Sequence, residues 1–407
     1  MAGTAERMRS YRGPALLSFG FRPFFLLAAI WAALAMILWI AMLAGAAPLP
    51  MRFDPITWHA HEFLFGYLAA VIGGFVLTAV PNWTGRLPVM GWGLGALAGL
   101  WVLGRIAVSV SALLPWQAVM LADLAMIVAL LACLLPEVVR GRNWRNLPVL
   151  GLVAVYGLGN AMFHIQAERA GIAFEGAGMR LGLAGALMLI ALIGGRIVPS
   201  FTRNWLAARD RTTLPVAFGR ADAAVLIGTG LVLLLFVLSP DLAVLPVLML
   251  ATGAAHLWRM SRWCGHRVLA EPLLWVLHLG YAMLALGFLA EAAAGLGALS
   301  PAAARHVWLA GAIGTMTMAV MSRATLGHTG RALHAGAGTT AIYLALTGSV
   351  AARLLAGLAA APGWMMHLSA GLWIAAFAGF VAIYGPMLVR PKTAPRAASP
   401  LRTSRVR

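Results

Sequence analysis

Histidines near one end of several apolar segments are the residues of this sequence best suited to chemistry. His59 and His61 open one long apolar segment, His164 lies late in another, and His306 opens a third. Imidazole is the usual protein ligand of haem iron and copper, and such groups from different helices can meet inside a bundle. The pattern predicts a metal or haem site at this end. For any one of these residues alone, the alternative is a hydrated histidine at the membrane interface.

The densest cluster is Trp58-His59-Ala60-His61-Glu62. In a regular α-helix His59 and Glu62 share a face, and His61 points nearly the opposite way. The three cannot then hold one ion, so we expect either that the histidines serve separate sites or that the segment is unwound. A carboxylate three residues from a histidine occurs in carboxylate-bridged metal bundles. The other role open to Glu62 is to cap the entry of the helix.

Four further polar residues lie within or beside apolar segments. His278 is about two turns into its segment, so it must form a hydrogen bond or bind a metal. Arg105 needs an anionic partner such as a haem propionate, unless its side chain reaches the interface. Asn160 lies one turn before His164 and suits the hydrogen-bond support of a ligating imidazole. His328 stands in a Gly-His-Thr-Gly-Arg string, which by composition is typical of a solvated turn.

The elements that position these residues are membrane helices. Of the 407 residues 62% are hydrophobic and only 10% are charged, which a soluble domain could not accommodate. About 20 apolar residues span a bilayer as a helix. Twelve such windows predict an all-α integral membrane protein, and we interpret the first as a retained helix rather than a signal peptide. The windows are 24–45, 58–80, 92–114, 116–138, 147–168, 179–198, 221–239, 241–259, 272–291, 303–321, 339–358 and 367–389.

Basic residues predict the orientation of these spans. Placing both termini in the cytoplasm puts 23 of the 30 Lys and Arg residues in cytoplasmic segments, as the positive-inside rule requires. The net charge of +18 is therefore explained by topology. It does not indicate a nucleic-acid partner, which needs a basic face on a folded module. Two cysteines, Cys133 and Cys264, are too few for a disulfide framework or a zinc ribbon.

Related strings suggest three repeats of four helices. The strings begin Ile-Gly-Gly or Ile-Gly-Thr near the ends of the second, sixth and tenth spans, and Gly74, Gly195 and Gly314 are 121 and 119 residues apart. The alternative is coincidence in an apolar chain. The prediction is one polytopic domain, residues 1–390, with repeats of roughly 1–140, 141–262 and 263–390, followed by a basic cytoplasmic tail, 391–407.

Several strings together resemble the NnrS family. They are Phe21-Arg-Pro-Phe-Phe, Trp58-His-Ala-His-Glu, Pro81-Asn-Trp-Thr-Gly, Gly194-Gly-Arg-Ile-Val-Pro, Trp275-Val-Leu-His-Leu-Gly-Tyr, Gly311-Ala-Ile-Gly-Thr-Met-Thr and Gly327-His-Thr-Gly-Arg. The resemblance implies a protein of the bacterial inner membrane that binds haem, expected to be haem b, and copper, and that acts in nitric oxide metabolism or defence. Positions that match recurrent polar residues of the family are His59, His61, Glu62, His164, His278, His306 and His328.

The three-by-four arrangement is also similar to the large subunit of haem-copper oxidases and nitric oxide reductases. There the haem ligands come from spans 2 and 10, which carry His61 and His306 here, with His59 as the substitute for His61. Spans 6 and 7 contain no histidine, so the usual copper triad is absent. We expect a copper site to use His164 with one of the span-2 histidines instead.

The leading functional hypothesis is a nitric oxide reductase or detoxification protein that receives electrons from a quinol or a partner protein. No string resembles a flavin, nicotinamide or iron–sulfur site. The alternatives are a solute permease of twelve spans without haem, and a haem-based nitric oxide sensor without turnover.

Overall fold

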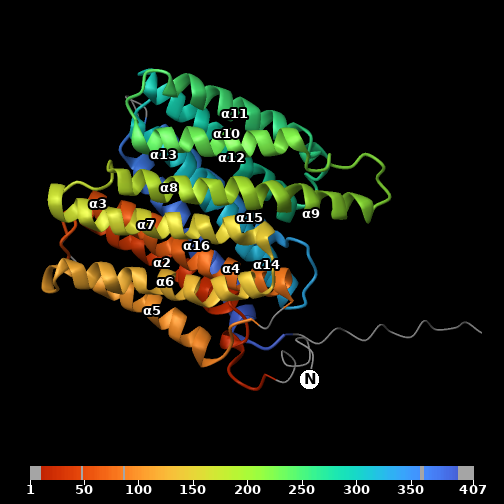
Figure 1. Cartoon of the computed structure of the whole chain (residues 1–407), viewed down its shortest axis with the longest axis horizontal. Helices are drawn as coiled ribbons and strands as arrows, with labels where there is room; N and C mark the ends of the chain where they lie inside the picture. Colours follow the sequence, from red (N-terminus) through yellow and green to blue (C-terminus); the bar gives the residue numbers. More distant parts are fainter. Residues whose placement is uncertain (1–10, 47–48, 86–87, 358–361, 393–407) are drawn as a thin grey trace, which may run out of the picture.

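The computed structural model describes residues 11–46, 49–85, 88–357 and 362–392, and these form helices without a β-strand. The long helices lie side by side in one bundle with alternating direction (Figure 1). Four short 3₁₀ turns lie between them, at Ala15–Leu17, Ser111–Leu113, Trp144–Asn146 and Gly265–Arg267.

Twelve long helical segments make up the described bundle. The first four are α2 (Phe21–Leu43), the continuous α3–η2–α4 (Pro55–His61, Glu62–Tyr67, Leu68–Thr84), α5 (Trp92–Ser109) and α6 (Trp116–Arg140). The next four are α7 (Leu147–Ala170), α8–η5–α9 (Ala177–Leu189, Ile190–Gly194, Gly195–Ala207), α10 (Arg220–Leu238) and α11 (Leu245–Ser261). The last four are α12 (Pro272–Gly295), α13–η7–α14 (Pro301–His306, Val307–Gly314, Thr315–His328), α15 (Ala337–Leu355) and α16 (Trp364–Val389).

The fold is that of an all-α integral membrane protein, as the sequence predicts. Ten of the described segments are long and apolar enough to cross a membrane; the two others are the 17-residue α11 and α13–η7–α14. Each predicted window falls on one helical segment. The sixth and tenth segments continue several residues beyond the ends of their windows. Proline at the first turn of α7 and α12 fits because that turn has no partner for its N–H.

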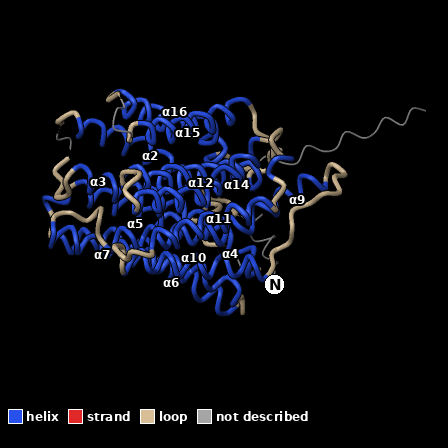
Figure 2. The backbone as a smooth tube through the Cα atoms, turned by 90° about the horizontal axis from the view of Figure 1, so that it is seen from above, coloured by secondary structure: helices blue, strands red, loops and turns tan. Residues whose placement is uncertain are grey.

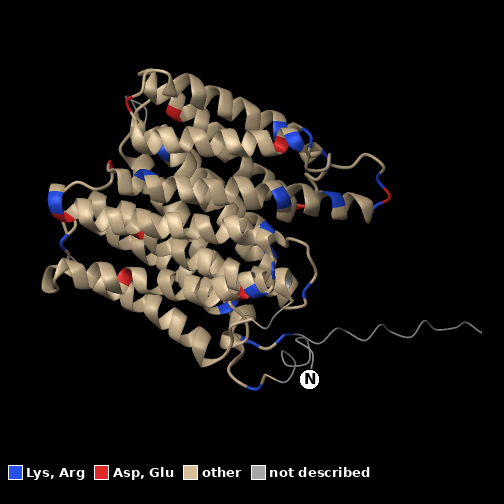
Figure 3. Cartoon of the chain, in the orientation of Figure 1, with Lys and Arg blue, Asp and Glu red and all other residues tan. Residues whose placement is uncertain are grey.

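Lys and Arg gather at the end of the bundle where α6, α11 and α16 finish, here called the basic end (Figure 3). The other end, where α3 and α13 begin, is called the distal end. By the positive-inside rule, this distribution of Lys and Arg predicts that the basic end faces the cytoplasm. The predicted basic tail lies outside the described residues, apart from residues 391 and 392.

The second helix of the first predicted repeat lies at the centre of the bundle. In its most apolar window 83% of residues are buried, against 33% in α6. The first and last helices pack along one another, and α15 packs along α16, so that α2, α15 and α16 lie together in Figure 2. The helix that carries His59, His61 and Glu62 is thus largely surrounded by protein.

Each second helix of the predicted repeats contains a π-helical stretch, namely η2, η5 and η7. A π turn widens the helix and disturbs its ladder of hydrogen bonds, and such turns occur often at functional sites. Side chains from neighbouring helices donate to carbonyls here: Trp101 Nε1 to Gly66 (2.9 Å), and Tyr156 Oη to Leu64. The repeat boundaries themselves stay a prediction.

Arg22 fastens the start of α2 to the end of α16. Its buried guanidinium donates from Nη1 to the carbonyls of Leu388 (2.8 Å) and Arg390 (2.7 Å). These are carbonyls that the end of a helix leaves unpaired. We expect Arg22→Met to lower the free energy of unfolding by about 1.5–3 kcal/mol, the contribution of a hydrogen bond to a charged group.

The measurement is the temperature at which detergent-solubilised protein loses its monodisperse peak in size-exclusion chromatography. Arg140→Met, at an exposed position of the same end, is the control and should leave this temperature unchanged. Equal temperatures for the two variants would contradict the stabilising role of Arg22.

Candidate functional site

Two histidines and an aspartate from three helices meet in the distal half of the bundle. His61 Nε2 lies 3.1 Å from Asp123 Oδ2 of α6, and His164 Nε2 of α7 lies 3.0 Å from the same oxygen. All three side chains are buried, and their ligand atoms lie within 4.8 Å of one another. Two imidazole nitrogens and a carboxylate oxygen at this spacing form a donor set for a transition-metal ion. These three residues are called the His61 cluster below.

Glu62 and Arg105 surround the His61 cluster. Glu62 lies 3.0 Å from His61 Nδ1 and accepts hydrogen bonds from Trp31 Nε1 (2.7 Å) and Arg105 Nη1 (2.5 Å). Arg105 also pairs with Asp123 through its second terminal nitrogen. Its partners are therefore carboxylates of the chain, whereas the sequence suggested a haem propionate; contact with a propionate stays a prediction.

Charge within this buried group favours a cation. Two carboxylates, Glu62 and Asp123, face one guanidinium, Arg105, so neutral histidines leave one negative charge in excess. An unbalanced charge away from water costs several kcal/mol. A proton on one of the imidazoles or a bound metal cation balances it. Asn160 adds support, since its amide donates to Asp123 Oδ2 (2.7 Å) and its carbonyl lies 3.1 Å from His61 Nε2.

Glu62 lies where the backbone changes from α-helix to the wider η2: the α-helical turn ends at His61 and η2 begins at Glu62. The Glu62 carboxylate contacts His61 and Arg105, whereas His59 packs on Trp39, so the two histidines lie in separate places, one of the alternatives that the sequence left open. Gly66 makes room for the pair, because a Cβ atom there would lie 2.6 Å from Arg105 Nη1 and 2.7 Å from Glu62 Oε2. The space beside Gly66, in the π-helical stretch, accommodates the ion pair of Glu62 and Arg105 between the helices.

His59 lies in a different place, opposite His306 at the start of the tenth helix. The two imidazole rings are nearly parallel, at 15°, with centroids 6.3 Å apart. His306 Nδ1 lies 2.6 Å from the carbonyl oxygen of Ala302, and the ring of His59 stacks on Trp39 at 4.1 Å. The structure thus places His59 opposite His306. The sequence had favoured His61 as the haem ligand that acts with His306, with His59 as its substitute.

Several buried polar atoms around this histidine pair have no hydrogen-bond partner among the described residues. They are His59 Nδ1, Trp39 Nε1 and Arg353 Nε. Arg353 of α15 interacts electrostatically with both imidazoles. Buried polar groups normally have partners, so each such atom asks for an explanation. Arg353 was not among the predicted site residues, although it falls within the predicted span 339–358; its position in the last turn of an apolar helix was the available signal.

His278 and His328 lie apart from these groups. His278 is buried and its Nε2 lies 2.9 Å from Thr202 Oγ1, which satisfies the expectation of a hydrogen bond or a metal ligand without deciding between them. His328 is exposed at the basic end, and its ring packs on Phe19 and Phe21 with centroids about 5.5 Å away. The described structure does not bring either residue to the His61 cluster.

A second buried charged group lies near the basic end, and sequence analysis missed it. Arg259 donates through Nε to Asp222 (2.9 Å) and through Nη1 to Tyr281 Oη (2.7 Å) and the η5 carbonyl of Ala191 (3.2 Å). His256 Nδ1 lies 2.9 Å from the same tyrosine oxygen. Asp222 and Arg259 lie close to facing ends of neighbouring spans, which was the signal that could have revealed their pairing.

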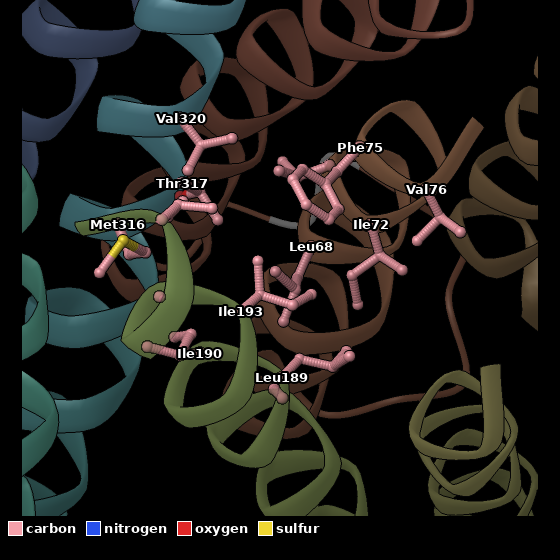
Figure 4. A pocket seen from close by; sticks show the side chains of 14 residues that line it. Leu68, Ile72, Phe75, Val76, Leu189, Ile190, Ile193, Met316, Thr317 and Val320 are labelled. Carbon is pink, nitrogen blue, oxygen red and sulfur yellow. The ribbon is translucent and has the colours of Figure 1, made fainter. Parts of the chain in front are cut away.

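An apolar pocket, called the apolar cavity below, lies between the second, sixth and tenth helices. Figure 4 shows Leu68 and Ile72 of α4 pointing toward Ile193 of η5, with Met316 and Thr317 of α14 at the side. Such walls suit an apolar occupant, because a water molecule needs two or more polar partners.

Comparison with protein families gives a match over nearly the whole chain. The pattern of the family described as NnrS protein matches residues 15–392, nearly the whole chain. No match was found among curated proteins or among solved structures. The chain belongs to the NnrS family.

Proposed function

We propose that this protein binds copper and haem in the bacterial inner membrane and handles nitric oxide there, as a reductase or a detoxification protein. The observation that carries the proposal is the His61 cluster, a buried donor set of two imidazoles and a carboxylate; with neutral histidines, the cluster together with Glu62 and Arg105 has one negative charge in excess. Membership of the NnrS family supports a nitric oxide-related role. The apolar cavity supports it as well, since nitric oxide is small and apolar and can enter from lipid.

In this proposal His61, His164 and Asp123 hold the copper ion. Imidazole nitrogen suits copper, and the carboxylate of Asp123 offsets part of its charge. Glu62 would fix the orientation of the His61 imidazole by accepting from its Nδ1–H, as outer hydrogen-bond partners commonly do at metal sites, and the Asn160 amide donates to Asp123. A metal ion with three protein ligands retains a position at which a small molecule can bind.

His59 and His306 are the residues that would hold the haem in this proposal. Their imidazole rings are nearly parallel, with centroids 6.3 Å apart, and His59 Nδ1 has no hydrogen-bond partner among the described residues. Arg353 is the cation suited to a propionate. When bound, the haem supplies an iron atom whose redox state and affinity for nitric oxide these residues tune.

The rival functions differ in observable ways. A permease for polar solutes needs a polar path, whereas the cavity among the central helices is lined by apolar side chains. A sensor would bind haem but show no turnover. Reduction of nitric oxide needs electrons, for which we propose a quinol or a partner protein. Consumption of nitric oxide by purified protein with a quinol analogue separates a reductase from a sensor.

Metal analysis tests the copper site directly. We expect purified protein reconstituted with Cu(I) to retain copper after gel filtration, and His61→Ala or His164→Ala to lose it, because each substitution removes one of three ligands. His367→Ala, at an exposed position near the distal end, is the matched control and should retain copper. Copper content is measured by mass spectrometry of the metal. Retention by both ligand variants would rule out this site.

A further inference from the structure

A second cavity opens at the distal end and reaches the His61 cluster. Its walls come from α6, α7 and the segments before α3 and after α5. His164 is part of the wall, with 3% of its side chain exposed, whereas His61 and Asp123 do not line the cavity. His164 is thus the member of the cluster that this cavity reaches.

An ion pair lies in the wall of this cavity. Arg52 Nη1 and Glu168 Oε2 are 3.4 Å apart, and 41% and 31% of their side chains are exposed. Arg52 is held by two further bonds: its backbone N–H donates to Ser111 Oγ (2.9 Å), and its Nη2 donates to the carbonyl of Leu114 (3.1 Å). Exposed ion pairs contribute little to stability, about 0–1 kcal/mol, so this one can open at small cost.

We infer that this cavity is the entrance through which a copper ion reaches the His61 cluster from the distal end. The inference rests on the proposed function, because it presumes that the cluster binds copper. A cation cannot reach the cluster from the lipid without a large desolvation cost. The cavity offers a route with charged groups in its wall instead: Glu168 lies one turn beyond His164 on α7, so its carboxylate can receive the ion once Arg52 has moved aside.

Blocking the cavity tests the inference. Ala167 lines it, and Ala167→Cys in a protein lacking Cys133 and Cys264 provides a single thiol there. Metal-free protein is labelled with a cationic methanethiosulfonate reagent and then given Cu(I) as a coloured chelate. The loss of colour gives the loading rate. We expect the label to slow loading about tenfold or more, since routes through lipid are closed to an ion, and a reducing agent to restore the rate.

The matched control is Ala170→Cys, three residues further along α7, exposed at the same end and outside the cavity wall. Its label should leave the loading rate unchanged. If labelled Ala167→Cys protein loads copper as fast as unlabelled protein, the entrance is wrong although the copper site stands. If the wild-type chain takes up no copper at all, the proposed function fails before the entrance is in question.

Discussion

His306→Ala and His59→Ala proteins are expected to lose the optical spectrum of a six-coordinate low-spin haem, which the wild type should show. Removing one axial imidazole leaves the iron without a ligand of equal strength, so the haem is lost or becomes high-spin. His61→Ala should retain the wild-type haem spectrum, because His61 faces Asp123 and His164 and not His306. The measurement is the absorption spectrum of purified protein together with the pyridine haemochrome, in which haem b is expected.

The matched control for this series is again His367→Ala, which should keep the wild-type spectrum. Two outcomes would contradict the assignment. A colourless wild-type protein at full folding would remove haem from the proposal. Wild-type spectra in both His59→Ala and His306→Ala would move the search for ligands to His278, the remaining buried histidine of the predicted set.

Arg105→Met should lower the free energy of unfolding by about 3–5 kcal/mol, the usual cost of removing one partner from a buried ion pair. The substitution leaves Glu62 and Asp123 in the protein interior without their guanidinium. Thermal unfolding of solubilised protein measures the effect. Adding Glu62→Gln should restore part of the loss, because it removes one of the two unpaired charges.

The control for Arg105→Met is Arg169→Met, an exposed arginine at the distal end, which should change stability by less than about 0.5 kcal/mol. An Arg105→Met protein as stable as this control would mean that the carboxylates are protonated in the native protein. The charge argument for a bound cation would then be withdrawn.

The helices could be predicted from the sequence because their cause is local. A run of apolar residues spans the membrane wherever it occurs, and basic loops orient it, so each of the twelve windows falls on a helix. The π stretch at Glu62 could not be predicted in this way. It depends on donors from other helices, such as Trp101 and Tyr156, that reach carbonyls of η2.

Only part of the site could be predicted, because contacts between helices are not local in the sequence. Residue type identified His61, His164 and Arg105 as candidates, because each is costly inside a membrane. Which of them meet depends on how α3, α5, α6 and α7 pack. Asp123 is an example: the sequence shows it as an isolated acid in an apolar span, and the fold makes it the shared partner of three of its neighbours.

The bond between Arg22 and the end of α16 joins residues more than 360 positions apart. A ribosome makes α2 first and α16 last, and α2 packs along α16. Until synthesis is almost complete, the face of α2 that packs on α16 in the native protein is therefore in contact with lipid. The native bundle closes only when the last helix arrives, so a chain that stops before Leu388 and Arg390 would lack the carbonyls to which Arg22 donates.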